Sequence, residues 1–201
     1  MAEAVNELRR AASSAGAVLV GHSMGCRVAL EAARRAPEAV VGIVLIEGSL
    51  RATGDPDEAV RRYRAHSVEE NMALLRSDFA GMFSAATPAA FRKLALRRVE
   101  EMDGNSAVQL MADMTRWDAA DAADALHAAR MPMLAIQSTY KEPGIARRPI
   151  EAGETSPWLQ LVGERTAGRA EIVRLAGLGH FPQVEKPELV NALIEVFTEQ
   201  L

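Results

Sequence analysis

The sequence contains a single cysteine, Cys26, among its 201 residues. A disulfide within the chain is therefore excluded, and this cysteine usage fits a reducing compartment. No apolar run approaches the roughly 20 residues of a membrane-spanning helix, and the N-terminus has no uninterrupted signal-like apolar segment. We therefore expect a soluble, cytoplasmic protein without a membrane partner.

Residue clusters with metal-ligand spacing are absent from the sequence, and so is a glycine-rich phosphate loop. We therefore expect no metal and no cofactor. The net charge of −4 is small, and the local groups of basic residues have acidic residues nearby. This pattern indicates solvated helix faces rather than a nucleic-acid partner. The basic residues in question are Arg61, Arg62, Arg64, Arg92, Lys93, Arg97 and Arg98.

Apolar residues make up 49% of the chain, enough for one compact domain with an insertion. Periodicity predicts an amphipathic helix over residues 2–12, broken by Ser13, Ser14 and Gly16. After it, short apolar runs alternate with helical segments, which predicts a parallel α/β sheet of about four strands flanked by helices. The predicted strands are 17–20, 40–46, 132–136 and 171–175, and the predicted helices that follow them are 26–35, 157–166 and 188–201.

The middle of the chain, residues 56–126, shows helical periodicity without a convincing strand. The periodicity is broken at Thr87-Pro88 and at Asp103-Gly104. Unbranched methionine adapts to irregular ligands, so we expect a few of the large apolar side chains here to line a substrate pocket. These side chains are Met72, Phe79, Met82, Phe83, Phe91, Met102, Met111 and Met114.

The motif Gly21-His22-Ser23-Met24-Gly25 lies between the predicted strand 17–20 and the predicted helix 26–35. A serine in this context is typical of a nucleophile elbow, a strained turn that exposes the serine hydroxyl. We expect both glycines of the motif to be needed because side chains there would collide as strand and helix close. The helix N-terminus favours negative charge on a substrate oxygen, and the Met24 N–H is the expected oxyanion donor.

A second motif, Leu178-Gly179-His180-Phe181-Pro182, lies near the C-terminus, and Glu185-Lys186-Pro187-Glu188 leads from it into the last predicted helix. Together with the serine motif, it resembles the α/β-hydrolase family, in which serine, acid and histidine follow in this order. The resemblance implies an α/β core over residues 1–54 and 129–201 and an all-helical cap over residues 55–128. It also implies a serine hydrolase, esterase-like, acting on an ester or related small apolar acyl substrate.

A serine hydroxyl needs an adjacent base, and His180 is the best candidate among the four histidines. It follows the predicted strand 171–175 and would lie at the carboxyl edge of the sheet, where it can reach Ser23. His22 lies inside the serine motif, but successive residues point in opposite directions. We therefore expect His22 to point away from Ser23 and to serve in packing or hydrogen bonding.

The acid that orients His180 has two candidates. In many family members it follows the strand that here is 132–136, where this chain has no aspartate and offers Glu142. The strand 40–46 ends instead in Glu47-Gly48-Ser49, an arrangement similar to that of haloalkane dehalogenases. Glu47 is the first candidate for the acid and Glu142 the second; a chain that uses neither is the third alternative.

Comparable hydrolases place several strands and a loop, often with His-Gly, before the nucleophile, and that loop supplies the second oxyanion donor. Here one predicted helix and one predicted strand precede Ser23, so we expect the chain to be the C-terminal part of the family's fold. The strand 17–20 would then be an exposed edge through which two copies could form a homodimer. The alternative to an enzyme is a non-catalytic ligand-binding or interaction module that lacks the oxyanion loop.

Overall fold

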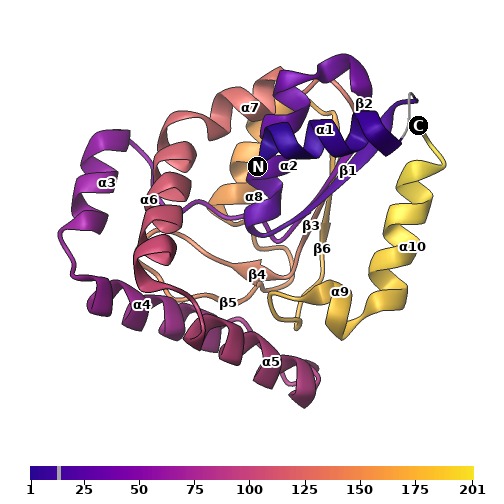
Figure 1. The fold of residues 1–201 in the computed structure, drawn as a ribbon. Helices are drawn as coiled ribbons and strands as arrows, with labels where there is room; N and C mark the ends of the chain where they lie inside the picture. The colour runs from indigo at the N-terminus through magenta and orange to yellow at the C-terminus, as the bar shows by residue number, and fades with distance from the viewer. Residues whose placement is uncertain (13–14) are drawn as a thin grey trace.

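The computed structural model describes residues 1–12 and 15–201, and a parallel sheet of four strands lies at its centre (Figure 1). The strands lie in the order β1-β2-β3-β6, and each neighbouring pair is parallel. All four strands therefore end at the same edge of the sheet, which confirms the predicted α/β class. The strands are β1 (Ala17–His22), β2 (Val40–Ile46), β3 (Met133–Gln137) and β6 (Ala170–Arg174).

Helices cover both faces of this sheet (Figure 1). Three helices pack on one face, and α10 packs on the other through Val190 and Phe197. The first helix, α1, lies against α2, where the buried Asn6 amide donates to the Ala32 carbonyl. These helices are α1 (Ala2–Ala12), α2 (Met24–Arg35), α7 (Ala122–Ala128), α8 (Pro157–Thr166) and α10 (Pro187–Thr198).

The segment between β2 and α7 is helical, as predicted, and contains no strand among its described residues. Side chains of Asp55, Ser67 and Asp103 cap the first turns of α3, α4 and α6. Such caps satisfy N–H groups that a helix leaves unpaired at its start. The helices are α3 (Pro56–Arg64), α4 (Val68–Ala80), α5 (Ala89–Glu100) and α6 (Gly104–Ala120).

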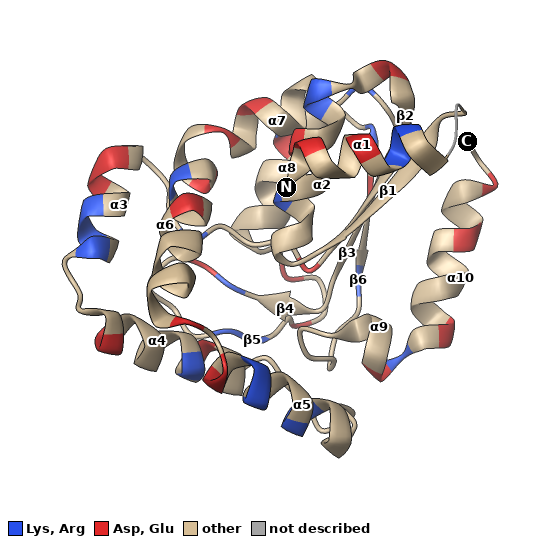
Figure 2. Cartoon of the chain, in the orientation of Figure 1, with Lys and Arg blue, Asp and Glu red and all other residues tan. Residues whose placement is uncertain are grey.

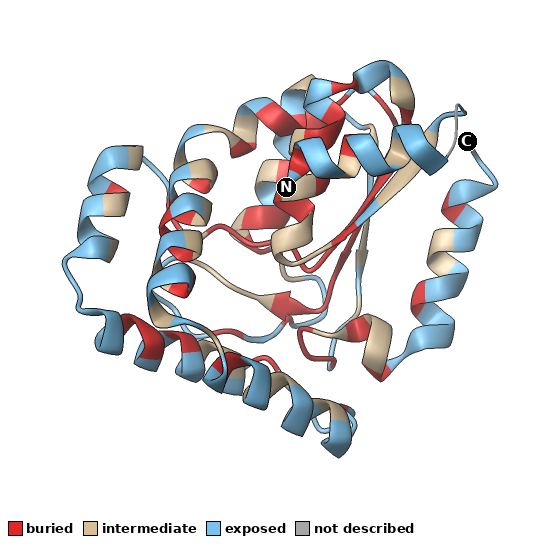
Figure 3. Cartoon of the chain, viewed as in Figure 1, coloured by how far each residue is buried: buried red, intermediate tan, exposed pale blue. Residues whose placement is uncertain are grey.

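The basic residues of the middle segment are solvated, as expected. Figure 2 shows Lys and Arg interspersed with Asp and Glu along α3 to α6. The side chains on α3 and α5 that we singled out are all exposed. Burial is concentrated elsewhere, on the inner strands and the helix faces that cover them (Figure 3).

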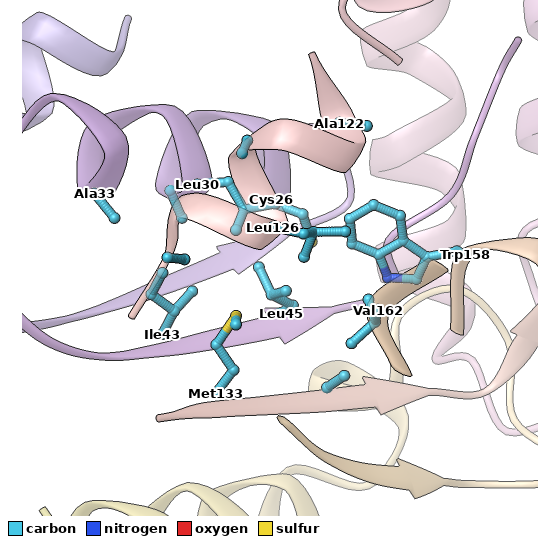
Figure 4. Close-up of a cluster of buried hydrophobic side chains, with 14 of the residues drawn as sticks. Cys26, Leu30, Ala33, Ile43, Leu45, Ala122, Leu126, Met133, Trp158 and Val162 are labelled. Atoms are coloured by element: carbon cyan, nitrogen blue, oxygen red, sulfur yellow. The ribbon is translucent and has the colours of Figure 1, made fainter. Parts of the chain in front are cut away.

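The larger core cluster lies between the sheet and the helices α2, α7 and α8 (Figure 4). Trp158 and Leu126 fill its centre, and both are buried. Burying one large apolar side chain contributes about 1.5–3 kcal/mol. Cys26 also belongs to this cluster, and its burial raises the pKa of the thiol to about 12. The cysteine is therefore a packed core residue rather than a reactive thiol.

The structure extends the predicted elements at the serine motif, ends the last predicted helix at Thr198 rather than at 201, and adds short elements. The first strand continues to His22 and α2 already begins at Met24, so the strand-to-helix turn is a single residue. Sequence patterns did not predict the shortest elements, which offer too few residues for a period to be recognised. They are the 3₁₀ turn Pro37–Ala39, β4 (Thr139–Tyr140), β5 (Arg148–Pro149) and α9 (Pro182–Glu185).

The strand β1 lies at an edge of the sheet, and its Val20 side chain is 54% exposed. Pairing of this edge with a second copy stays a prediction, as does the division into core and cap at residues 54 and 128. Ser13 and Ser14, which we expected to end the first helix, lie outside the described residues. Within the described ranges, every helix is too short or too polar to cross a bilayer.

Candidate active site

Ser23 forms the turn between β1 and α2 with a φ of 55°, a left-handed conformation that costs a non-glycine residue energy. Its main-chain N–H donates to the Ile46 carbonyl at 2.8 Å, which ties the turn to the end of β2. The strain and the position at the carboxyl edge of the sheet match the predicted elbow.

The two glycines of the serine motif differ in the space that a side chain would have at each position. A Cβ on Gly21 would lie 2.4 Å from the main-chain oxygen of Gly25, a separation that rigid backbone cannot relieve. A Cβ on Gly25 would meet nothing within 4 Å. The expectation that both positions must be glycine is therefore wrong for Gly25. The close approach is made by the backbone of Gly25 toward the Cα of Gly21, so only Gly21 must lack a side chain.

Glu47 follows β2 and is fully buried. It has a φ of 57°, and its main-chain N–H donates to the Ile136 carbonyl at 2.8 Å. Its carboxylate accepts hydrogen bonds from the main chain and the hydroxyl groups of Ser138 and Thr139. A buried carboxylate with this many donors stays ionised and fixed in orientation.

Arg147 lies beside this carboxylate, with its Nη1 3.5 Å from Glu47 Oε2. The same nitrogen donates to the Thr139 hydroxyl at 2.6 Å, and the side chain is almost wholly buried. Sequence analysis missed this residue because it lies on an irregular loop after Gly144, where no periodic pattern marks a buried position. A buried guanidinium without a nearby carboxylate would be costly, so the two charges belong together.

His180 lies in the loop after β6, and its Nδ1 is 2.9 Å from Glu47 Oε2. Its Nε2 is buried and has no hydrogen-bond partner among the described residues. With Nδ1 carrying the proton that Glu47 accepts, Nε2 presents a free lone pair. The structure thus brings Glu47 and His180 together and leaves the second ring nitrogen available.

The ionisation of this pair follows from its surroundings. Burial raises the pKa of Glu47, but the hydrogen bond from His180 and the charge of Arg147 outweigh it, so the pKa is lowered overall. Burial and the Arg147 guanidinium lower the pKa of His180 to about 3, against the opposing effect of Glu47. At neutral pH the carboxylate is therefore charged and the imidazole is neutral, the state that a general base requires.

The loop that carries His180 is fastened to the segment between α4 and α5. The His180 N–H donates to the Met82 carbonyl at 2.7 Å. The Glu185 carboxylate accepts hydrogen bonds from the Gly179 N–H at 2.7 Å and from the Ser84 hydroxyl at 2.9 Å. A Cβ on Gly179 would lie 2.6 Å from the Met82 oxygen, so the two segments can approach this closely only at a glycine.

Ser23, Met24 and His180 line one cavity of about 290 Å³ between the sheet edge and the middle helices. Most of the remaining wall is apolar and comes from α4 to α6 and the adjoining loops. The expected methionine and phenylalanine lining is therefore present. Its residues are Leu75, Phe79, Met82, Met102, Leu110, Met111, Met114 and Phe181.

The other large side chains of the middle segment take different places. Met72 packs into the cluster between α4, α5 and α6. Phe83 and Phe91 contact the ring of Phe181, with centroids 5.7 and 4.9 Å apart. These aromatic contacts support the His180 loop from outside the cavity.

His22 donates a hydrogen bond from its Nε2 to the His180 carbonyl at 2.7 Å, so it is a hydrogen-bonding residue as expected. His22 also lines the same cavity as Ser23, whereas we expected its side chain to point away from that of Ser23. Strand alternation does not extend to Ser23, because the left-handed turn begins there. Glu142 is bonded elsewhere: its carboxylate accepts from the Tyr140 hydroxyl at 2.8 Å.

Comparison with known proteins shows the family and the fold of the chain. The alpha/beta hydrolase family pattern matches residues 2–193. No curated protein sequence matches the chain significantly.

Among solved structures, Est816, described as an N-acyl homoserine lactone degrading enzyme, superposes with a TM-score of 0.72 at 19% identity, over 98% of this chain and 73% of its own. An esterase from Exiguobacterium antarcticum superposes with a TM-score of 0.71 at 16% identity, over 99% of this chain and 72% of the esterase. A thermophilic esterase from Thermogutta terrifontis superposes with a TM-score of 0.63 at 20% identity, over 99% of this chain and 69% of the esterase. The family match covers nearly the whole chain, and the parallel sheet flanked by helices agrees with it: the chain belongs to the alpha/beta hydrolase family.

Proposed function

We propose that the protein is a serine hydrolase that cleaves esters of small apolar acyl groups by two-step acyl transfer. The observation that carries this proposal is the state of His180, which is held by Glu47 through Nδ1 and presents an unpartnered Nε2. The same cavity is lined by Ser23, which is half-buried on the strained turn between β1 and α2. A neutral imidazole and a serine that line one cavity are the groups needed to activate a hydroxyl nucleophile.

In the first step, Ser23 Oγ bonds to the substrate carbonyl carbon while His180 Nε2 takes the hydroxyl proton. The imidazolium that forms lies against the Glu47 carboxylate, which stabilises it. The tetrahedral intermediate then collapses. The bond between carbonyl carbon and alcohol oxygen breaks, and the alcohol leaves with the proton from His180.

The negative oxygen of that intermediate needs hydrogen-bond donors. Met24 is the first residue of α2, where main-chain N–H groups have no partner within the helix. The helix N-terminus also carries partial positive charge. We assign the Met24 N–H as one oxyanion donor, worth about 3 kcal/mol of transition-state stabilisation.

In the second step, water takes the place of the alcohol. His180 removes a proton from the water as its oxygen attacks the acyl carbon, and the proton passes to Ser23 Oγ as the acid leaves. The methionine-rich wall favours an apolar acyl chain, since unbranched thioethers adapt to irregular shapes. Two of the similar structures are described as esterases, which supports an ester as the substrate.

A fluorophosphonate probe tests this proposal directly because it labels only a serine that is activated and reachable. We expect the purified protein to be labelled and the Ser23→Ala variant to be unlabelled. Ser77→Ala is the matched control, since Ser77 is exposed on α4 outside the cavity, and it should label like the wild type.

Ester turnover provides the second arm of the same experiment, with p-nitrophenyl octanoate as substrate. We expect turnover by the wild type and its loss in Ser23→Ala and in His180→Ala. A protein that is folded by circular dichroism yet neither labels nor hydrolyses the ester contradicts the proposal. That result would favour a non-catalytic ligand-binding module.

A further inference from the structure

Two charged side chains, Arg51 and Asp78, stand in the otherwise apolar outer wall of the cavity that Ser23 lines. Both also line a second hollow of about 530 Å³, which lies between α3, α4 and the loop around Pro143. The pair therefore borders both spaces, and we call its position the junction. A molecule that extends from Ser23 past the methionine side chains contacts the charged groups of Arg51 and Asp78 before it enters the outer hollow.

The charges at this junction do not cancel. Arg51 Nη1 is 4.0 Å from Asp78 Oδ2, and Lys141 Nζ is 3.4 Å from Asp78 Oδ1. Two cations thus share one carboxylate, which leaves a surplus of positive charge. The nearby Arg147 adds none, because its charge is balanced by Glu47 at 3.5 Å. On the rim of the hollow, Arg62 is paired with Glu58 at 3.3 Å.

Arg51 is held in place by its main chain rather than by its guanidinium. Its N–H donates to Asp118 Oδ2 at 2.7 Å, and Asp118 is in turn held by two hydrogen bonds from the buried Arg27. Within the described part of the chain, the guanidinium makes the 4.0 Å ion pair and no hydrogen bond. The side chain is 24% exposed, so its donors can reach a ligand in either space.

We propose that the protein prefers esters whose apolar acyl chain ends in a carboxylate, which binds Arg51 at the junction of the two spaces. This inference rests on the proposed hydrolase function and names its substrate class. The acyl chain of the substrate lies along the methionine side chains of the cavity. Its terminal carboxylate accepts a charge-assisted hydrogen bond from Arg51, which replaces the 4.0 Å contact of Arg51 with Asp78. Lys141 supplies a second positive charge beside the same position.

The test compares p-nitrophenyl monoesters of adipic, suberic and sebacic acid with the hexanoate, octanoate and decanoate of equal chain length. Acids of this length are chosen so that the tail does not attack its own ester. For each pair, the ratio of kcat/KM for the acidic ester to that for the neutral ester is measured. Each variant is its own reference, so a partial loss of folded enzyme cancels in the ratio.

We expect Arg51→Gln to lower this ratio about ten-fold, the effect of one hydrogen bond to a charged group. Asp78→Asn removes the competing carboxylate and should raise the ratio. Arg61→Gln is the control on α3, where Arg61 is exposed and outside the hollow, and the ratio should stay within about two-fold. Ratios that do not change in Arg51→Gln and Asp78→Asn overturn the inference.

A binding arm separates failure of this inference from failure of the hydrolase proposal. Monoethyl suberate is titrated calorimetrically into the Ser23→Ala protein, with and without Arg51→Gln. We expect the second substitution to weaken binding about ten-fold. Equal affinities in the two proteins overturn the inference even if no ester is turned over. Loss of affinity without turnover supports the carboxylate site and contradicts the hydrolase proposal alone.

Discussion

Glu47 Oε2 and His180 Nδ1 lie 2.9 Å apart, although 133 positions separate the two residues in the chain. They meet because Glu47 follows β2 and the His180 loop follows β6, and both strands end at one edge of the parallel sheet. The contact is buried and is reinforced by Ser138, Thr139 and Arg147. This geometry favours Glu47 over Glu142 as the proposed acid.

Exchange of the two candidate acids provides a direct test. Glu47→Gln keeps the size of the side chain but can no longer stabilise the imidazolium, so we expect kcat to fall on the order of 10³- to 10⁴-fold. Glu142→Gln should leave kcat within about two-fold, because Glu142 bonds to Tyr140. Ester hydrolysis is measured beside thermal unfolding, so that lost activity is not mistaken for lost fold. Equal losses in both variants would contradict the assignment.

Arg147 should set the pH range of activity. Burial is the largest cause of the lowered pKa of His180, and the charge of Arg147 is the second. In the proposed mechanism His180 must be neutral to act as the base, so we expect kcat/KM to fall as the pH drops through this pKa. Arg147→Gln removes the positive charge, raises the pKa of His180 and moves the acidic limb of the profile to higher pH.

Two variants control that measurement. Arg147→Lys retains the charge and should keep the limb near its wild-type position. The neighbouring Arg148 is exposed and paired with Glu154, and Arg148→Gln should not move the limb. A limb that stays in place or moves to lower pH in Arg147→Gln would show that the guanidinium does not act on His180.

The two glycines of the serine motif should respond differently to alanine. Gly21→Ala places a methyl group against the backbone of Gly25 at 2.4 Å, so we expect a loss of about 1–3 kcal/mol or more in the free energy of unfolding. Gly25→Ala meets open space in a helix, where alanine is favoured, and should not destabilise the protein. Urea unfolding of both variants checks this difference. Comparable losses would mean that the turn needs both glycines.

Cys26 should report on unfolding. It is buried, its Sγ lies 3.3 Å from the carbonyl oxygens of Gly21 and Ile46, either of which can accept its proton, and its pKa is raised to about 12, so the reactive thiolate is suppressed. We expect no reaction with a thiol reagent at neutral pH in the folded protein and rapid reaction in denaturant. Prompt modification of the native protein would indicate that the core near the elbow opens.

The sequence patterns predicted the regular elements well because hydrophobic periodicity and the residues that break helices and strands can be recognised within short segments of the chain. The helix over residues 2–12 and the strand over 40–46 match α1 and β2 in their bounds. The serine and histidine motifs located Ser23 and His180 by their junctions with strands. Local patterns could not identify Arg147 or Arg51, since both lie outside regular elements and their roles depend on contacts with distant segments.

Met82 contributes its side chain to the cavity wall and its carbonyl to the N–H of His180. In the proposed mechanism, the fit of the substrate and the orientation of His180 therefore depend on one peptide segment. We expect an ester that shifts this wall to tilt the imidazole away from Ser23, and loss of near-attack alignment would slow the chemical step. Discrimination among acyl chains should then appear in kcat more than in KM: a poorly fitting ester is still bound, but the misaligned base reacts with it slowly.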